Sequence, residues 1–175
     1  MDKPQVGILM GSDSDLPVMQ DAAKALENFG IGYEIHVMSV HRTPEAVVEY
    51  VESAEGKGYK VLIASAGMAA HLAGVVAGHT PLPVIGVPLA AKTTGGIDAL
   101  FATVQMPPGV PVATVAINGG KNAGILAAQI IGAGDAGVRA KVAEYKKKMA
   151  GEVMMKDEKL QAGGFKKYME ENGLI

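Results

Sequence analysis

Hydrophobic residues fall along the chain in five short runs, separated by segments whose apolar residues have helical spacing. The runs are rich in Val and Ile and mostly lack polar alternation, which is typical of strands buried on both faces of a sheet. They cover residues 5–10, 33–39, 60–65, 83–88 and 112–117. The helical segments cover residues 16–29, 44–57, 69–78, 96–105 and 122–131. This alternation predicts an α/β fold with a parallel sheet between two layers of helices. Right-handed crossovers leave few topologies, and among these we favour a flavodoxin-like strand order.

The chain changes character after Gly134. Nine of its 16 Lys and Arg residues lie beyond that point. Apolar residues recur there at helical spacing, at Val142, Tyr145, Met149, Val153 and Met154. The pattern predicts an amphipathic helix with a solvated basic face, and a basic docking surface is the alternative. We therefore divide the chain into an α/β domain, residues 1–134, and a helical extension of the same domain, residues 135–175. We expect Phe165, Tyr168 and Leu174 to pack on a neighbouring subunit.

Composition narrows the class of protein. The 175 residues are 49% hydrophobic but only 5% aromatic, so aliphatic side chains build the core. A net charge of −2 gives no electrostatic argument for nucleic acid or an anionic membrane as a partner. With no cysteine, disulfides and thiolate chemistry are excluded. No signal-like N-terminal pattern or membrane-length apolar run occurs, so we expect a cytoplasmic protein.

Polar residues gather in the loops that follow the predicted strands. These loops read GSDSD (11–15), SVHRTP (39–44), SAGMAAHLAG (65–74) and LAAKTTGG (89–96). Because ligands of open parallel sheets bind beyond the carboxyl ends of the strands, we expect the loops to form one site. The first loop leads from a strand into a helix, which suits an anion, although its two aspartates would repel a phosphate.

A positive charge near this loop would offset the repulsion between its aspartates and a phosphate, and Arg42 in the second loop can supply it. Arg42 is the only arginine in the first 138 residues. Its planar guanidinium suits a phosphate group. We expect Arg42, Ser12 and backbone N–H groups to bind a phosphate, while Asp13 and Asp15 accept hydrogen bonds from ribose hydroxyls or an amino group. GSDSD is not G-x-G-x-x-G, which argues against a dinucleotide site.

Each candidate also has a structural alternative. Ser12 or Asp13 would serve as a helix cap, His41 as a loop residue bonded to backbone, and His71 as a buried helix histidine. We expect structural roles for the other two histidines, His36 and His79. No histidine pair has metal-binding spacing, which argues against a metal site, and no G-x-S-x-G elbow occurs, which argues against a Ser-His-Asp hydrolase.

Several of these segments together resemble the PurE family of N5-carboxyaminoimidazole ribonucleotide mutases of de novo purine synthesis. The matching segments, in order, are MGSDSD, SVHRTP, AGMAAHLAG, LPVIGVP, VQMPPGVPVATVAI and NAGILAAQI. The resemblance implies a three-layer α/β/α sandwich, a homo-octamer with active sites at subunit junctions, a ribonucleotide substrate, and no cofactor or metal.

The resemblance also assigns roles to residues. It implies that His41 is catalytic and that His71 is a second active-site histidine. The predicted substrate-binding residues are Gly11, Ser12, Asp13, Asp15, Ser39, Arg42, Gly67, Ala69 and Leu72. The sequence departs from the family pattern at Val40, Met68 and Ala73, where alanine, glycine and proline are usual. We expect Met68 to narrow the pocket.

HRTP and AAHL side with the mutase branch of the family, in which a carboxylate moves from the exocyclic nitrogen to C4 of the imidazole. We expect His41 to give a proton to the nitrogen and take one from C4, converting N5-CAIR to CAIR. The apolar loop 66–72 would exclude water and hold CO2. Direct carboxylation of aminoimidazole ribonucleotide is the alternative, and a non-catalytic, flavodoxin-like nucleotide-binding module is a third reading.

Overall fold

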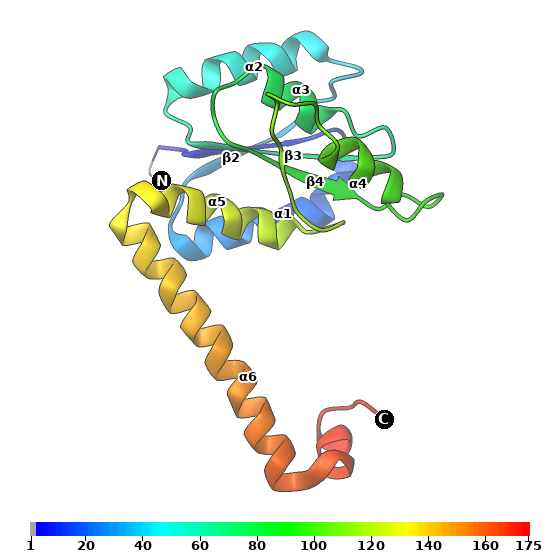
Figure 1. Cartoon of the computed structure of the whole chain (residues 1–175), viewed down its shortest axis with the longest axis vertical. Coiled ribbons are helices and arrows are strands. Elements are labelled where there is room, and N and C mark those ends of the chain that lie inside the picture. The colour runs from blue at the N-terminus through cyan, green and yellow to red at the C-terminus, as the bar shows by residue number, and fades with distance from the viewer. Residues whose placement is uncertain (1–2) are drawn as a thin grey trace.

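The structure, a computed structural model, describes residues 3–175, and its centre is one parallel sheet. The strands are β1 (Val6–Met10), β2 (Tyr33–Val37), β3 (Val61–Gly67), β4 (Val84–Leu89) and β5 (Ala113–Thr114). Their order is β2-β1-β3-β4-β5, and every neighbouring pair is parallel. The predicted flavodoxin-like order is confirmed. It brings the ends of β1, β2, β3 and β4 to the same edge of the sheet (Figure 1).

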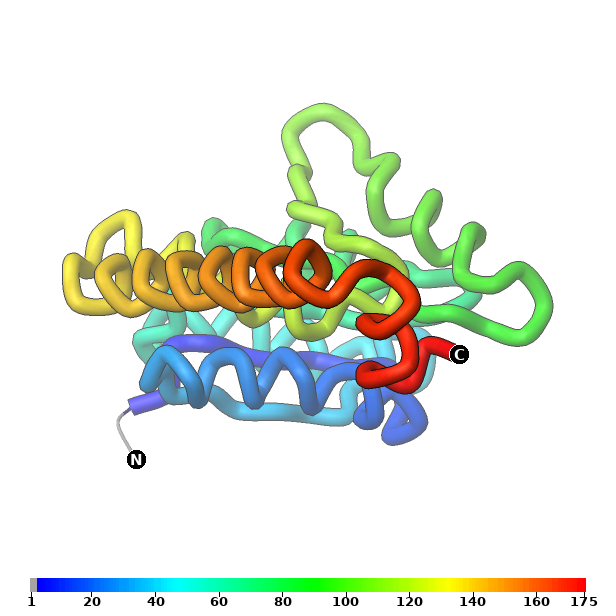
Figure 2. The backbone as a smooth tube through the Cα atoms, turned by 90° about the horizontal axis from the view of Figure 1, so that it is seen from below, coloured from blue at the N-terminus to red at the C-terminus, as the bar shows by residue number. Residues whose placement is uncertain are grey.

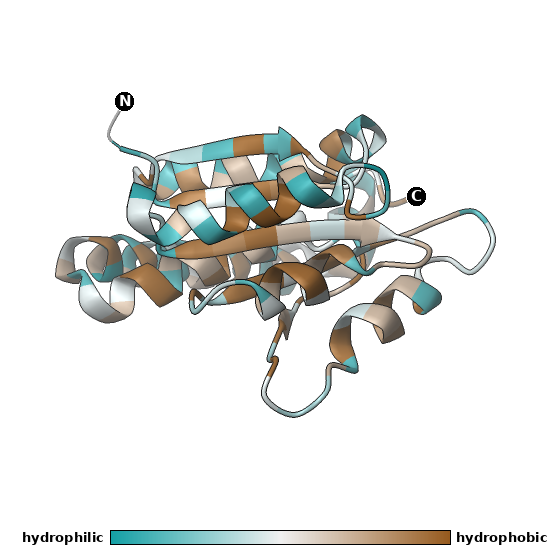
Figure 3. Ribbon diagram, turned by 90° about the horizontal axis from the view of Figure 1, so that it is seen from above, coloured by the Kyte–Doolittle hydropathy of each residue, from teal (hydrophilic) through white to brown (hydrophobic). Residues whose placement is uncertain are grey.

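Helices cover both faces of the sheet, which confirms the three-layer prediction. They are α1 (Leu16–Phe29), α2 (Pro44–Lys57), α3 (Leu72–Gly78), α4 (Ile97–Val104), α5 (Gly120–Gly134) and α6 (Ala136–Glu171), with the short 3-10 helix η1 (Asp13–Asp15) before α1. One hydrophobic core joins alternate strand residues to α1 and α5, and a second joins the remaining ones to α2 and α3. The strands carry many hydrophobic residues (Figure 3), and these pack against the helices on either face.

Close packing of α1 on α5 depends on residues without a side chain. A Cβ atom added at Gly124 would lie 2.5 Å from the Ala22 carbonyl oxygen, and one at Gly120 would lie 2.3 Å from the Val18 carbonyl oxygen. These separations are far below van der Waals contact. The two glycines therefore let the helix backbones approach, and this packing holds α1 and its N-terminal loop against the sheet.

Several element boundaries differ from the predictions. The ranges of α1 and α2 are as predicted, but β5 spans only two of the six expected residues. Its partner β4 contains Pro88, which has no N–H to continue the ladder. Pro88 only accepts a hydrogen bond, from the Asn118 N–H at 2.9 Å. Helix α3 begins three residues later than predicted, because the chain turns sharply at Met68, whose φ is +56°.

The predicted C-terminal helix forms and extends away from the sheet domain (Figure 1). Seen from below, it runs across in front of that domain (Figure 2). Asp135 caps it by accepting hydrogen bonds from the Gly137 and Val138 N–H groups. Near its start, Lys141 donates to the Phe29 carbonyl at 2.8 Å. Beyond that region several of its large apolar residues are exposed, among them Met149, Val153, Met154 and Phe165. The helix breaks at Gly164 and turns back. None of the helices in residues 3–175 combines the length and apolar character needed to cross a bilayer.

Candidate active site

A cavity of about 580 Å³ lies at the carboxyl ends of the strands, where the loops after β1, β2, β3 and β4 meet. Ten of the predicted site residues line it: Gly11, Ser12, Asp15, Ser39, His41, Arg42, Gly67, Ala69, His71 and Leu72. Asp13 is the exception, since it is exposed and does not line the cavity. Seven further lining residues were not among the predicted site residues: Ser14, Val40, Ala66, Met68, Leu89, Ala90 and Ala91. All seven lie in the four loops that the sequence analysis singled out, and this position was the signal that could have identified them.

The loop after β1 forms a turn closed by its own side chains. The Ser12 N–H donates to Asp15 Oδ2 at 3.2 Å, and the Ser14 N–H donates to Ser12 Oγ at 3.3 Å. This reciprocal arrangement is a capping box, so the capping alternative for Ser12 is confirmed, on η1 rather than on α1. Burial raises the pKa of the Asp15 carboxyl above its ordinary value. Backbone N–H groups of this loop were expected to bind a phosphate, but those of Ser12 and Ser14 already have acceptors within the loop.

Arg42 links the first two loops. Its Nη2 donates to the Gly11 carbonyl, across 31 positions of sequence. The loop that carries it is a compact turn, in which the Ser39 carbonyl accepts the N–H groups of Arg42 at 3.1 Å and Thr43 at 2.7 Å. The Ser39 N–H in turn donates to Thr43 Oγ1 at 3.1 Å. Arg42 is exposed and lines the cavity, and its guanidinium has five N–H donors in all.

His41 and His71 lie in contact, although 30 residues separate them. His41 Nε2 is 2.8 Å from His71 Nδ1, and the two rings are nearly perpendicular, at 82°. One of these nitrogens must carry the proton that the other accepts. The alternative of a buried helix histidine is wrong for His71, which is exposed and lies at the N-cap position of α3. The contact joins the second loop to the third.

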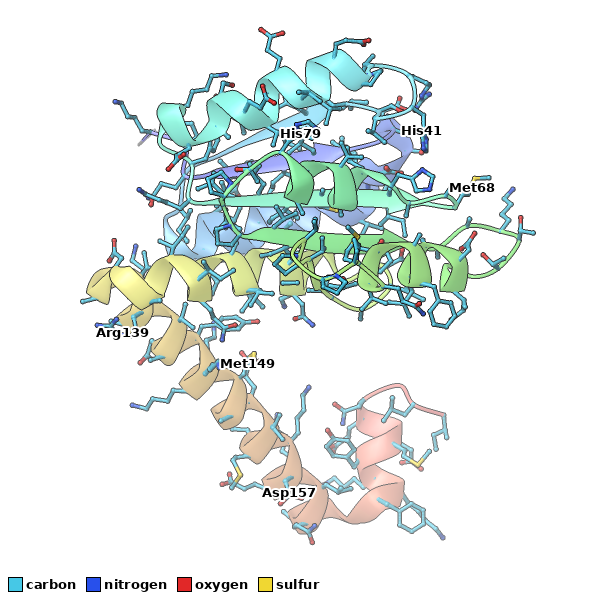
Figure 4. All side chains as sticks on the ribbon, turned by 45° about the horizontal axis from the view of Figure 1, so that its top comes forward. His41, Met68, His79, Arg139, Met149 and Asp157 are labelled. Carbon is cyan, nitrogen blue, oxygen red and sulfur yellow. The ribbon has the colours of Figure 1, made fainter. Side chains whose placement is uncertain are left out.

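The loop between β3 and α3 carries Met68 at the mouth of the cavity. Figure 4 shows Met68 and His41 beyond the same edge of the sheet. Met68 is 64% exposed and lines the cavity, and its backbone is left-handed. The chain then turns again, with the His71 N–H donating to the Ala69 carbonyl at 2.9 Å.

The other two histidines lie outside the cavity. His36 Nε2 is 3.1 Å from Glu34 Oε2, and His79 Nδ1 is 3.2 Å from Glu52 Oε1. The Tyr59 hydroxyl also donates to Glu34, and this hydrogen bond holds the pKa of the carboxyl below its ordinary value. In the described part of the chain, no three His, Asp or Glu side chains group closely enough to hold a metal ion.

Comparisons with known proteins give matches over most of the chain. A family model described as AIR carboxylase matches residues 5–152. The N5-carboxyaminoimidazole ribonucleotide mutase of Thermotoga maritima is 57% identical, with 96% of this chain and 98% of that protein covered. The phosphoribosylaminoimidazole carboxylase of Candida glabrata is 51% identical over 96% of this chain, which spans 30% of the longer protein. The crystal structure of Treponema denticola PurE superposes with a TM-score of 0.83 at 34% identity, covering 90% of this chain and 98% of that one.

Proposed function

The chain belongs to the AIR carboxylase (PurE) family, and we propose that it is an N5-carboxyaminoimidazole ribonucleotide mutase, an isomerase of purine biosynthesis. The observation that carries the proposal is the contact between His41 and His71 in a cavity that also holds Arg42. A proton-transfer group and a phosphate-binding group then face one ligand. The Thermotoga maritima relative bearing the mutase name matches over nearly its whole length.

The ribonucleotide binds with its phosphate at Arg42. The guanidinium is already oriented by the Gly11 carbonyl, so little side-chain freedom is lost on binding. The Ser12 hydroxyl exchanges its bonds within the loop for one to the ligand. Asp15, half-buried beside it, accepts a hydrogen bond from a ribose hydroxyl. The apolar wall made by Gly67, Ala69 and Leu72 lies against the base.

The reaction moves a carboxylate with no net gain or loss of protons. Protonated His41 donates to the carbamate nitrogen, the N–C bond breaks with its electron pair left on nitrogen, and CO2 is released into the cavity. C4 of the imidazole attacks CO2 and forms the new C–C bond. The proton on C4 then passes to His41, which restores both the aromatic ring and the starting charge of the histidine.

His71 keeps His41 in the orientation that this cycle needs. When His41 carries both ring protons, its Nε2–H donates to His71 Nδ1, and Nδ1–H of His41 is left for the substrate. His71 acts as an acceptor and must itself be neutral at that nitrogen. In this arrangement His71 stabilises the cationic partner, which is a positioning role, while His41 exchanges protons with the substrate.

Direct carboxylation of aminoimidazole ribonucleotide is the second candidate, favoured by the 51% identity to the Candida glabrata carboxylase. The two reactions share the attack of C4 on CO2 and the loss of the C4 proton. They differ in the source of CO2, which is a bound carbamate in one and the solution in the other.

The decisive experiment supplies both substrates to the purified protein. We expect rapid conversion of N5-CAIR to CAIR, and little CAIR from aminoimidazole ribonucleotide with bicarbonate. The reverse preference would establish the carboxylase. Activity with neither substrate would reject both. His71→Asn should lower kcat less than His41→Asn, and the opposite ranking would move the proton transfer to His71.

We further propose that the chain assembles as a cytoplasmic homo-octamer with active sites at subunit junctions, in which the extension 135–175 packs on a neighbouring subunit. The exposed apolar residues of α6 and the turn after it support this, since the chain itself covers few of them. Truncation after Gly151 should give smaller species in sedimentation. An assembly of unchanged size would contradict the packing proposal.

A further inference from the structure

The proposed substrate carries two anionic groups, a phosphate and a carboxylate, but the cavity offers few cations. Among the described residues that line it, only Arg42 has a permanent positive charge, and Asp15 adds a carboxylate of its own. With Arg42 assigned to the phosphate, the carboxylate of N5-CAIR has no cation among the lining residues. Lys92 is the only lysine in the four loops that form the cavity.

The order of the strands sets the order of the ligand groups along the site. Arg42, after β2, donates to Gly11, after β1, and His41 in the same loop contacts His71, after β3. Strand β4 is the next neighbour of β3, on the side away from β1 and β2. A ligand with its phosphate at Arg42 and its reacting nitrogen at His41 therefore directs the carboxylate on that nitrogen toward the loop after β4.

Lys92 is held beside the cavity by this loop. Three consecutive residues after β4 line the cavity, and Lys92 comes directly after them. The loop is a closed turn, in which the Gly95 N–H donates to the Ala91 carbonyl at 3.0 Å and the Ala90 N–H donates to Asn118 Oδ1 at 2.9 Å. Lys92 is exposed, and within residues 3–175 its ammonium forms no ion pair. Its charge is available to a ligand.

We infer that Lys92 binds the migrating carboxylate of the ribonucleotide and lets the site distinguish the carboxylated ribonucleotides from aminoimidazole ribonucleotide. The inference rests on the proposed mutase function. The carboxylate moves between neighbouring positions of one ligand, and the flexible stem of a lysine can follow it. Released CO2 is uncharged and has no such attraction to the ammonium. Lys92 therefore contributes to affinity and specificity, while proton transfer stays with His41.

Binding measurements on ribonucleotides with and without the carboxylate test the inference. Isothermal titration calorimetry at low ionic strength gives the Kd of CAIR and that of aminoimidazole ribonucleotide, which lacks the carboxylate. Lys92→Gln should raise the Kd of CAIR about two- to fivefold, the range of a partly exposed ion pair, and leave that of aminoimidazole ribonucleotide unchanged. The difference should shrink as salt is added, because ions screen exposed charges.

Two further variants are matched controls. Lys92→Arg keeps the positive charge and should retain most of the affinity for CAIR. Lys24→Gln removes the same net charge from an exposed position on α1, outside the cavity, where Lys24 Nζ lies 2.9 Å from Gln20 Oε1. It should leave both dissociation constants unchanged.

The outcomes separate this inference from the mutase proposal. Equal loss of affinity for both ribonucleotides in Lys92→Gln would show that Lys92 acts on a group that they share, and would overturn the inference. An unchanged Kd for CAIR would also overturn it, as would an equal rise with Lys24→Gln. No binding of CAIR to the unsubstituted protein would overturn both proposals. Selective loss of CAIR affinity in Lys92→Gln, in a protein that does not convert N5-CAIR, would support the role of Lys92 and reject the mutase function.

Discussion

Replacing Arg42 by lysine keeps the positive charge of the proposed phosphate site but removes the planar fork. One Nη2 N–H of Arg42 already donates to the Gly11 carbonyl, so the remaining guanidinium N–H groups are available to the ligand. A lysine ammonium that kept the Gly11 bond would have fewer donors in a less favourable geometry. The expected loss is one charge-assisted hydrogen bond, about 1–3 kcal/mol, or about five- to 150-fold in affinity.

The assay compares KM, kcat and direct binding of the ribonucleotide product. KM and the dissociation constant should rise together while kcat changes little, because the phosphate is remote from the reacting carbon. Arg139→Lys is the matched control. It replaces the only other arginine, which donates to the Gly132 and Ala133 carbonyls at the end of α5. An unchanged KM for Arg42→Lys, or an equal rise for Arg139→Lys, would refute the assignment of Arg42.

Other consequences are open to measurement. His41→Asn should lower kcat by about 10²–10⁴-fold with little effect on ribonucleotide affinity, since asparagine cannot exchange a proton near neutral pH; near-normal turnover would exclude it as the proton shuttle. Gly124→Ala should lower the free energy of unfolding by about 1–3 kcal/mol, because the new methyl group meets a carbonyl oxygen of α1 at 2.5 Å. Gly56→Ala, with open space around it, should be neutral or stabilising in the same denaturation assay. The hydrogen bond from Tyr59 lowers the pKa of Glu34 from 4.5, so its stabilising effect is present above pH 4.5 and is lost as pH falls through the lowered pKa. The stability difference from Glu34→Gln should therefore shrink in acid, and a constant difference would argue against this linkage.

The local sequence of the first loop, residues 11–15, predicted its turn but not the hydrogen bonds within it. GSDSD between an apolar run and a helical segment predicted a turn with Ser12 in a capping or binding role. The structure adds that the Ser12 and Ser14 N–H groups are occupied by side chains of the same loop. Which acceptor an N–H group finds depends on dihedral angles that residue types alone do not specify.

Hydrophobic periodicity by itself determines the main architecture. Strands buried on both faces are continuously apolar and helices have a 3.6-residue period, so the order and type of the elements follow from the chain itself. Parallel strands also place the ends of β1 to β4 at one edge, which is why the loops with Arg42, His41 and His71 were expected to meet.

Tertiary structure decided which side chains of those loops are in contact. The 2.8 Å contact of His41 with His71 joins residues 30 positions apart, and its geometry depends on the left-handed turn at Met68. The length of β5 likewise depends on Pro88 in its neighbour, and the approach of α5 to α1 depends on Gly124. Such features arise between segments that are remote in sequence. Local propensity acts over a few residues, whereas these distances are set by how the whole core packs.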